Sequence, residues 1–501
     1  MQLNYKKTFF VGFAFLLISL FWQAYDTIVP RILVDKFGMN QTLSGAVMAF
    51  DNILALFMLP LFGHISDRTK TRIGKRTPYI IVGTLLSAVF FATSTFADNV
   101  QLSKLHGITE NEFLYSSNIL DEESLRIDGV QIKEYMDSKG ITEAGFINIS
   151  PDDENYFLVT AARNAYAWKK TIEDPVPIIM FIVLLFFVLL SMSIFRSPAV
   201  ALMPDVTLRP LRSKANAVIN LMGAAGGLLA ILVGIILGTD KTSYMSYTWY
   251  FVAIAGLMLL FLGIFLLKVN EPKMLEEVEQ EKRKYGLIDE EEEESATPGE
   301  KLGGGKLRSL LFLLASVFLW FTAYNAVTSK FSVYAGNVLN MGYNKPLLIA
   351  QGVAIASFIP IGIVASKIGR KKSILAGIAL IAAAFVGAFF VTPSTTAFMY
   401  PIFIIAGLGW ATINVNSYPM VIEMSKGSNV GRYTGFYYTA SMAAQIITPI
   451  LSGLIMDLTS MRMLFPYAAL FSVLALFTML FVMHGDNKPQ SNVGIEIYDS
   501  E

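Results

Sequence analysis

Two aspartates lie inside long apolar stretches of the sequence, where a charged side chain is costly. Asp26 lies near the end of the first apolar run, and Asp51 lies nearer the middle of the second, directly before Asn52. An ionised aspartate within a membrane helix costs about 2.5–3.5 kcal/mol on insertion scales, so each acid requires a polar cavity, a partner or a bound proton. Either carboxyl could load and release a proton, or its oxygens could bind sodium together with Asn52. We therefore expect cation coupling at Asp26, Asp51 and Asn52, with a capping or interface role as the alternative and with H⁺ or Na⁺ left open.

Amide and aromatic side chains accompany these acids and recur in other apolar runs. Amides hydrogen-bond pairs of hydroxyl groups, and aromatic faces cover C–H surfaces, so the combination is typical of a site for a neutral polyol. An amide also serves as an interhelical hydrogen bond and a tryptophan as an interfacial anchor, and the sequence does not separate these roles. The candidate substrate-binding residues are Trp22, Gln23, Tyr25, Asn220, Trp320, Tyr324, Asn325, Asn414, Asn416 and Gln445.

The composition indicates what kind of chain positions these residues. Of 501 residues, 54% are hydrophobic and 16% are charged, whereas soluble domains carry about 25% charged residues. Basic and acidic side chains balance at 39 each, so the net charge does not favour nucleic-acid binding. The sequence has no cysteine, no metal-ligand spacing among its three histidines, no nucleotide-binding loop and no nucleophile–base pair. We therefore expect a polytopic membrane protein in contact with lipid, without catalytic residues, cofactor, metal, nucleotide or nucleic-acid partner.

Twelve apolar runs are long enough to cross a bilayer, which takes about 20 residues per helix. Lys and Arg concentrate in alternate short loops, which predicts a cell-membrane protein with both termini in the cytoplasm. The expected spans are Phe9–Val29, Leu43–Phe62, Pro78–Phe96, Val176–Val200, Ala215–Leu237, Tyr247–Leu267, Leu310–Phe331, Leu347–Ala365, Ser373–Val391, Phe398–Ile422, Tyr433–Met456 and Met463–Met483.

Two long polar segments separate groups of spans. Residues 98–174, between the third and fourth spans, are expected to form an extracellular insert, and residues 271–306 an acidic cytoplasmic linker. We expect an N-terminal six-helix bundle over 1–270, a C-terminal six-helix bundle over 307–485 and a cytoplasmic tail over 486–501.

The two halves repeat one another in register. Asp26 matches Asn325 at an offset of 325 − 26 = 299, and Gly63 matches Gly362 at 362 − 63 = 299. Beyond residues 98–174 the offset becomes smaller, as expected if that segment was added to one half of a duplicated unit. Two parallel halves joined by a linker predict an all-α membrane protein of two pseudo-symmetric bundles that rock about a site at mid-depth.

The loop after the second span carries a specific signature. Gly63-x-x-x-Asp67-Arg68 followed by Gly74-Lys75-Arg76 resembles the loop motif of the major facilitator superfamily. The longer stretch from Ser66 to Pro78 resembles the branch that holds the sucrose/proton symporters and the glycoside–pentoside–hexuronide:cation symporters. The resemblance implies the major facilitator fold, with twelve transmembrane helices and no enzymatic activity. It departs from the family pattern at Ser366, which replaces the acid in the second copy of the loop.

Charged residues at the ends of the spans suggest a gate. In the resembling family, the acid at the position of Asp67 helps to lock the halves on the cytoplasmic side, partly by meeting the positive end of the eleventh helix. Arg196, near the end of the fourth span, either pairs with an acid or extends to the membrane interface. We interpret the set as a gating network, with charges that only fix topology as the alternative: Asp67, Arg72, Arg76, Arg196, Asp205, Arg212, Glu423 and Arg432.

The sequence therefore predicts a secondary active transporter that works by alternating access. The favoured interpretation is a cation-coupled sugar symporter, with H⁺ preferred, for a disaccharide or glycoside. A multidrug or metabolite exporter on the same fold is an alternative, although the number of amides favours sugar. A non-transporting sensor or adhesion protein acting through the insert is another.

Overall fold

The structure is a computed structural model, and among the residues that it describes, twelve helices are long and apolar enough to cross a membrane. Parts of the predicted linker (286–303) and the whole predicted tail (486–501) lie outside the described residues. The structure describes residues 2–123, 125–127, 130–208, 211–285, 304–424 and 430–485.

The first half of the chain supplies six of these helices. They are apolar on most of their circumference, as expected for helices surrounded by lipid and by other helices. They are α1 (Tyr5–Arg31, continued by the π-helix η1, Ile32–Lys36), α2 (Gln41–Arg68), α3 (Thr77–Leu102), α8 (Val176–Asp205), α9 (Arg212–Leu237) and α10 (Thr248–Lys268).

The second half supplies the other six and is reached through a short polar helix, α11 (Glu271–Tyr285). Two short 3₁₀ turns, η4 (Pro393–Phe398) and η6 (Met461–Met463), lead into the helices that follow them. The spanning helices are α13 (Gly304–Asn337), α14 (Asn344–Ile368), α15 (Arg370–Phe389), α16 (Met399–Glu423), α17 (Val430–Leu458) and α18 (Leu464–Leu480).

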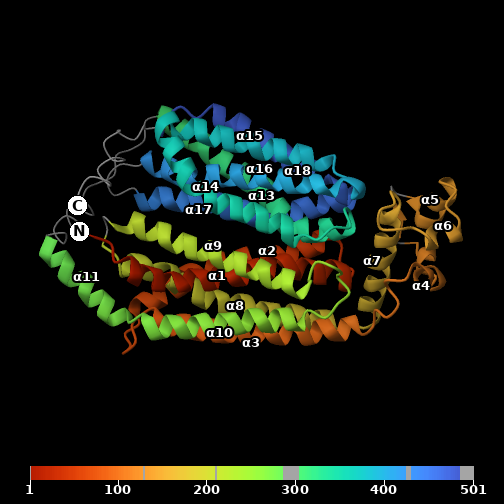
Figure 1. Ribbon diagram of the computed structural model, residues 1–501, viewed down its shortest axis with the longest axis horizontal. Helices are drawn as coiled ribbons and strands as arrows, with labels where there is room; N and C mark the ends of the chain where they lie inside the picture. Colours follow the sequence, from red (N-terminus) through yellow and green to blue (C-terminus); the bar gives the residue numbers. More distant parts are fainter. Residues whose placement is uncertain are drawn as a thin grey trace.

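The spanning helices form two groups that lie side by side along the long axis of the molecule (Figure 1). In the first half α1 packs on α9 and α10, and α3 packs on α8 and α10. In the second half α13 packs on α17 and α18, and α15 packs on α16 and α18. The halves meet through α2 against α17, α9 against α14 and α1 against α13.

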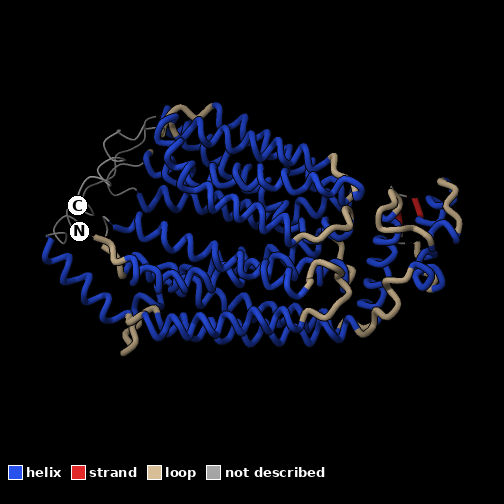
Figure 2. The backbone as a smooth tube through the Cα atoms, viewed as in Figure 1, coloured by secondary structure: helices blue, strands red, loops and turns tan. Residues whose placement is uncertain are grey.

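A small subdomain projects from one end of the spanning helices (Figures 1 and 2). It has its own core, in which Leu114, Ile132, Phe146 and Leu158 are fully buried. We call this end of the molecule the insert side, and the opposite end, where the N-terminus and α11 lie, the linker side (Figure 1). The elements of the subdomain are α4 (Asn111–Ser116), η2 (Ile119–Asp121), β1 (Arg126–Ile127), β2 (Val130–Gln131), α5 (Ile132–Ser138), α6 (Glu143–Ile147) and α7 (Tyr156–Glu173).

A buried ion pair joins the base of this subdomain to the end of the first helix. Lys36 Nζ lies 2.6 and 2.8 Å from the two carboxylate oxygens of Asp98, and neither side chain is exposed. Beside it, Gln101 Nε2 donates to the Lys36 carbonyl at 2.8 Å, and Thr171 Oγ1 of α7 donates to the Phe37 carbonyl at 2.9 Å. Asp98, expected as the first residue of the insert, thus lies inside α3, because the buried ammonium holds its carboxylate among the helices.

The two halves contact each other closely at the insert side. Asn337 Nδ2 of α13 donates to Asp35 Oδ1 of η1 at 2.7 Å, and the hydroxyls of Thr239 and Tyr343 lie 2.9 Å apart. Further hydrogen bonds between the halves at this side join Asp457 and Lys330 to the start of α2, and Asn344 to Thr239. The structure is therefore closed between the halves at the insert side.

Candidate functional site

The two intramembrane acids lie at the same depth. Asp26 lies 36 − 26 = 10 residues before the end of η1 at Lys36, and Asp51 lies 51 − 41 = 10 residues after α2 begins at Gln41. At 1.5 Å per residue, each lies about 15 Å along its helix from the insert-side end. The two carboxylates interact electrostatically with each other, and each interacts with the guanidinium of Arg196 in α8. Three helices of the first half therefore bring three charges to one region.

Aromatic side chains of α1 lie beside these charges. The Arg196 guanidinium lies 5.6 Å from the ring centroid of Trp22, so the structure places this arginine among the central residues as well as near the end of its helix. Trp22 and Tyr25 meet edge to face at 5.5 Å, and the Tyr25 hydroxyl interacts with Asp51. Within the described residues, Trp22 Nε1 and the Tyr25 hydroxyl have no hydrogen-bond partner although both are buried. Buried polar groups normally have a hydrogen-bond partner, so these two unpartnered groups are unusual.

The second half presents a matching aromatic surface. Tyr324 of α13 and Trp410 of α16 stack in parallel, with centroids 3.5 Å apart and an interplanar angle of 2°. Tyr324 also interacts electrostatically with Asp26, across the boundary between the halves. Trp320 Nε1 and Asn325 Nδ2, both on α13, are buried and unpartnered in the described part of the chain. The central region therefore combines acids from one half with aromatic and amide groups from the other.

The two amides of α16 have different surroundings. Asn414 lies one helical turn after Trp410, and its Nδ2 donates to the Trp410 carbonyl at 3.2 Å. Asn416 is 2% exposed and donates to the Thr412 carbonyl at 2.9 Å, on the face of α16 that packs on α15. A Cβ placed at Gly377 of α15 would lie 3.0 Å from Thr412 Cβ, which shows how close this packing is. The structure therefore brings Asn414 towards the stacked rings but places Asn416 inside the second half.

Asn220 and Gln445 lie on helix faces that turn towards the opposite half. Asn220 precedes Gly227 by seven residues and so shares its face of α9, where a Cβ at Gly227 would touch Gln351 of α14. Gln445 lies one turn before Pro449, on the face of α17 that packs on α2. Gln351, which the sequence analysis did not single out, has a buried carbonyl oxygen with no partner among the described residues. A glutamine at this position has no distinctive sequence pattern. Only the packing of α9 on α14 shows that Gln351 lies at the boundary between the halves.

Asn52 and Gln23 also have defined positions. The backbone N–H and the Nδ2 of Asn52 donate to Asp51 Oδ1 at 2.5 and 2.7 Å, so this amide orients the neighbouring acid. Gln23 lies seven residues after Leu16 on the face of α1 that packs on α9, where a Cβ at Gly226 would meet the Leu16 carbonyl at 2.2 Å. Gln23 therefore lies between two helices of the first half.

Comparison with known proteins identifies the family. The profile of the Major Facilitator Superfamily matches residues 164–425 and 348–496, which together exceed half of the chain. The chain belongs to the major facilitator superfamily. A second profile of this superfamily, described as MFS/sugar transport protein, matches residues 10–104. No protein with a curated description matches the sequence.

Solved structures of superfamily transporters share the fold of this chain. The xylose transporter XylE from E. coli, in an inward open conformation, has a TM-score of 0.58 at 16% identity and covers 96% of this chain and 97% of its own. A mutant of the nucleoside transporter NupG has a TM-score of 0.52 at 13% identity, covering 95% of this chain and 99% of its own. The predicted fold class is confirmed: the chain is a multi-pass membrane protein with the major facilitator fold, and a transporter rather than an enzyme.

The loop that carries the superfamily signature forms an ion-pair cluster at the linker side. Arg76 Nε donates to Asp205 Oδ2 at 2.9 Å, and Lys75 Nζ lies 3.1 Å from the same oxygen. Arg76 also pairs with Asp67 through its Nη2. Three residues of the predicted gating network therefore lie together, all within the first half.

The second half repeats this arrangement. Arg370 pairs with Glu423, and these residues are the repeat equivalents of Lys75 and Asp205, at offsets of 370 − 75 = 295 and 423 − 205 = 218. The ion pair thus recurs within the other half of the superfamily fold. Arg370 was not among the predicted gating residues, although its match to Lys75 in the internal repeat could have identified it.

The other predicted gating residues at the linker side are Arg212, Arg72 and Arg432. Arg212 donates to the Pro204 carbonyl at 3.0 Å, which fastens the turn between α8 and α9. Arg72 is exposed, and the side chain of Arg432 lies outside the described residues. The ion pairs of Arg76 with Asp67 and Asp205, and of Arg370 with Glu423, each lie within a single half.

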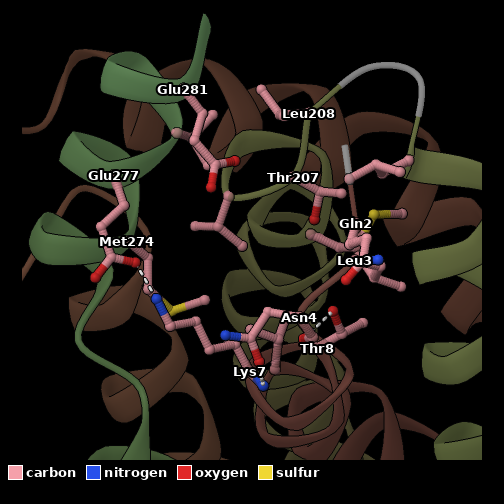
Figure 3. Close-up of a pocket in the computed structure, with 15 residues that line it drawn as sticks. Gln2, Leu3, Asn4, Lys7, Thr8, Thr207, Leu208, Met274, Glu277 and Glu281 are labelled. Carbon is pink, nitrogen blue, oxygen red and sulfur yellow. Dashed lines mark hydrogen bonds and ion pairs between the residues drawn. The ribbon is translucent and has the colours of Figure 1, made fainter. Parts of the chain in front are cut away.

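The linker helix α11 is fastened to the first half beside the signature loop. Glu271 is 1% exposed and accepts from the backbone N–H groups of Arg76 and Thr77 at the start of α3, at 2.8–3.1 Å. Figure 3 shows the pocket that α11 encloses with the start of α1, where Lys7 pairs with Glu277. None of the predicted substrate-binding residues lines this pocket.

Proposed function

We propose that this transporter is a cation-coupled sugar symporter for a disaccharide or related glycoside, working by alternating access. The observation that carries the proposal is the group of charges formed by Asp26 and Asp51, which lie at the same depth, and Arg196, which interacts with both. Two carboxylates and one guanidinium leave one negative charge uncompensated within the membrane. Because an unpaired buried charge is costly, this group favours the binding of one cation.

A proton suits this group better than a sodium ion. Arg196 interacts with both Asp26 and Asp51, so its positive charge would repel a metal ion placed between them. A proton needs only one carboxylate oxygen and leaves the other acid to pair with the guanidinium. Asn52 holds Asp51 through two hydrogen bonds, which leaves Asp26 and the remaining oxygen of Asp51 as proton acceptors.

The surroundings of the charges suit a polyhydroxylated substrate. Unpartnered donors of Trp22, Tyr25, Trp320 and Asn325 would bind hydroxyl oxygens, and the stacked ring of Tyr324 would cover an apolar sugar face. The sugar-transport profile of the superfamily covers the first three helices. XylE is a transporter of xylose and NupG of nucleosides, so substrates with sugar rings occur on this fold.

The orientation follows from the basic residues. Lys75, Arg76, Arg212 and Arg370 lie at the linker side, which we place in the cytoplasm together with both termini, in the cell membrane. The insert is then extracellular, and the closed contact at the insert side makes this an inward-facing state. We propose that the separate ion-pair clusters of the linker side form a gating network whose contacts change when that side closes.

Uptake by purified protein in liposomes tests this proposal. A panel of labelled mono- and disaccharides is offered with inward H⁺ and Na⁺ gradients imposed separately. We expect the proton gradient to accelerate uptake of at least one disaccharide or glycoside, and Asp51→Asn to abolish that acceleration. Uptake of no sugar, or efflux of apolar cations in its place, would contradict the proposal and favour the exporter alternative.

A further inference from the structure

An aspartate of the second half binds the start of a helix in the first half. Asp457 is the second-last residue of α17, at the insert side. Its Oδ1 accepts from the backbone N–H of Gln41 at 2.8 Å, and its Oδ2 accepts from the backbone N–H of Thr42 at 2.7 Å and from the Thr42 hydroxyl at 2.5 Å. These three hydrogen bonds join the first residues of α2 to the last turn of α17.

A buried lysine completes the same contact. Lys330 of α13 is 1% exposed, and its Nζ donates to the Gln41 carbonyl at 2.6 Å. It also interacts electrostatically with Asp457. The start of α2 is therefore held by two helices of the second half, through one anion on its N–H groups and one cation on its first carbonyl.

The contact uses donors that α2 does not need for its own formation. Asn40 caps the helix in the ordinary way, since its side chain accepts from the Leu43 N–H at 2.8 Å. The N–H groups of Gln41 and Thr42 have no partner within the helix, and the positive end of the helix dipole lies there. Asp457 binds these groups only while the halves touch, and water can replace it when they separate.

We propose that Asp457, Gln41, Thr42 and Lys330 form a latch between the halves, here called the α2–α17 latch, which sets the ratio of inward-facing to outward-facing transporter. Asp457 and Lys330 are positioning residues in this role and do not contact the substrate. Opening of the insert side separates α2 from α17, so all four hydrogen bonds must break in each transport cycle. The inference rests on the alternating access of the proposed function but not on its substrate or coupling ion.

The opposite end of the same helix pair carries an aspartate with a different partner. α2 and α17 run antiparallel, and Asp67, the second-last residue of α2, lies at the linker side. Its side chain is 57% exposed and pairs with Arg76 of its own half. The aspartate at the insert-side end of the pair thus joins the halves, and the ion pair that the structure gives for the aspartate at the linker-side end lies within one half.

Distances between paired spin labels test the latch in the full-length protein in liposomes. The chain has no cysteine, so a cysteine pair at Leu43 and Ser460 reports on the insert side, and a separate pair at Lys70 and Lys367 reports on the linker side. We expect Asp457→Ala to raise the ratio of long to short insert-side distances about tenfold, since a lost cap and lost charged hydrogen bonds have effects of this size.

The linker-side pair must shift to shorter distances in the same variant. Thr42→Val removes only the hydrogen bond of the Thr42 hydroxyl, so it should change the insert-side distances in the same direction but by less. It replaces Asp457→Ala as the test if that variant folds poorly. Asp174→Asn is the matched control, because this insert-side carboxylate pairs with Lys104 within the first half.

Unchanged insert-side distances in both Asp457→Ala and Thr42→Val would overturn the latch. An insert-side change without closure at the linker side would also overturn it, since it would show local loosening of α2 only. Absence of sugar uptake by the unmodified protein would contradict the proposed function and leave these distances as an independent result.

Discussion

At the scale of single residues, the central group is defined by a charge imbalance. Asp26 and Asp51 share the neighbourhood of one arginine, Arg196, whose guanidinium also lies over the ring of Trp22. A cation–π contact and two carboxylates surround the guanidinium, and all three charged residues are partly exposed. Loading of one cation would neutralise the group, so substrate and cation can cross the membrane together without a net buried charge in the protein.

Replacement of Asp51 by asparagine separates coupling from substrate movement. The amide keeps the shape of the side chain but cannot bind a proton, so we expect gradient-driven accumulation of sugar to fall at least tenfold. Exchange of sugar across the membrane at equal pH should continue at a similar rate. Asp174→Asn, outside the membrane, should leave both assays unchanged. Equal loss of exchange and accumulation in Asp51→Asn would contradict a coupling role.

The stacked rings of Tyr324 and Trp410 provide a second test at this scale. Trp410→Ala removes the ring that supports Tyr324, and we expect the apparent affinity for sugar to fall roughly three- to tenfold, the range of an aromatic contact. Trp410→Phe should retain most of the affinity. Trp249→Ala serves as the control, because Trp249 is 76% exposed on α10. The concentration dependence of uptake measures the effect, and equal affinities in the three variants would remove Trp410 from the site.

At the scale of helices, close approach of α2 to α17 depends on glycine. A Cβ at Gly45 would lie 2.0 Å from the Pro449 carbonyl oxygen, closer than any real contact. Gly45→Ala should therefore push the helices apart and shift the protein away from the state closed at the insert side. A cysteine placed at the buried Ser452 should then react severalfold faster with an impermeant maleimide. Gly256→Ala, where a Cβ meets nothing within 4 Å, should leave the rate unchanged.

The ion pair below the insert should contribute strongly to stability. Lys36→Met leaves the Asp98 carboxylate buried without its cation, and the loss of one member of a buried pair costs about 3–5 kcal/mol. The midpoint temperature of thermal unfolding in detergent should fall strongly in this variant. It should recover in the double variant Lys36→Met, Asp98→Leu. The exposed pair of Lys170 and Glu173, in which the hydrogen bond from Lys170 lowers the pKa of Glu173, should matter little. A small effect of Lys36→Met would show that water reaches this pair.

The helices themselves could be predicted from hydropathy, but their ends could not. Long apolar runs indicate spans whatever their neighbours, because lipid and protein interiors both favour apolar side chains. The expected spans left Arg31, Lys36 and Asp98 outside the helices, yet all three are buried. Each has a partner distant in sequence, and a buried charge is tolerated only when such a partner is present.

At the scale of the whole molecule, the insert and the contact between the halves share one element. Gln101 of α3 donates to the carbonyl of Lys36 in η1, and Thr171 of α7 in the insert donates to the carbonyl of Phe37, the residue after η1. Asp35 of η1 accepts from Asn337 of the second half. The insert is thus attached to the segment that must move when the insert side opens. This connection ties the position of the subdomain to the state of the transporter.

The acids of the central region could be singled out from sequence because a charge inside an apolar run is unusual. Trp410, Gln351 and Asp457 could not be singled out in this way, whereas Lys330, inside the expected span Leu310–Phe331, carried the same signal and was missed. Trp410 resembles other aromatic residues of the spans, and Asp457 lies at a helix end, where acids are common. Their significance depends on which helices the fold brings together, and that information becomes available only with the structure.

The number of cations moved with each sugar tests the coupling mechanism most directly. Proton and sugar fluxes are measured together in liposomes, with the reversal potential giving their ratio. The balance of two carboxylates against one guanidinium predicts one proton per sugar in the unmodified protein and none in Asp51→Asn or Asp26→Asn. Sugar transport without a cation in the unmodified protein, or an unchanged ratio in both variants, would contradict it.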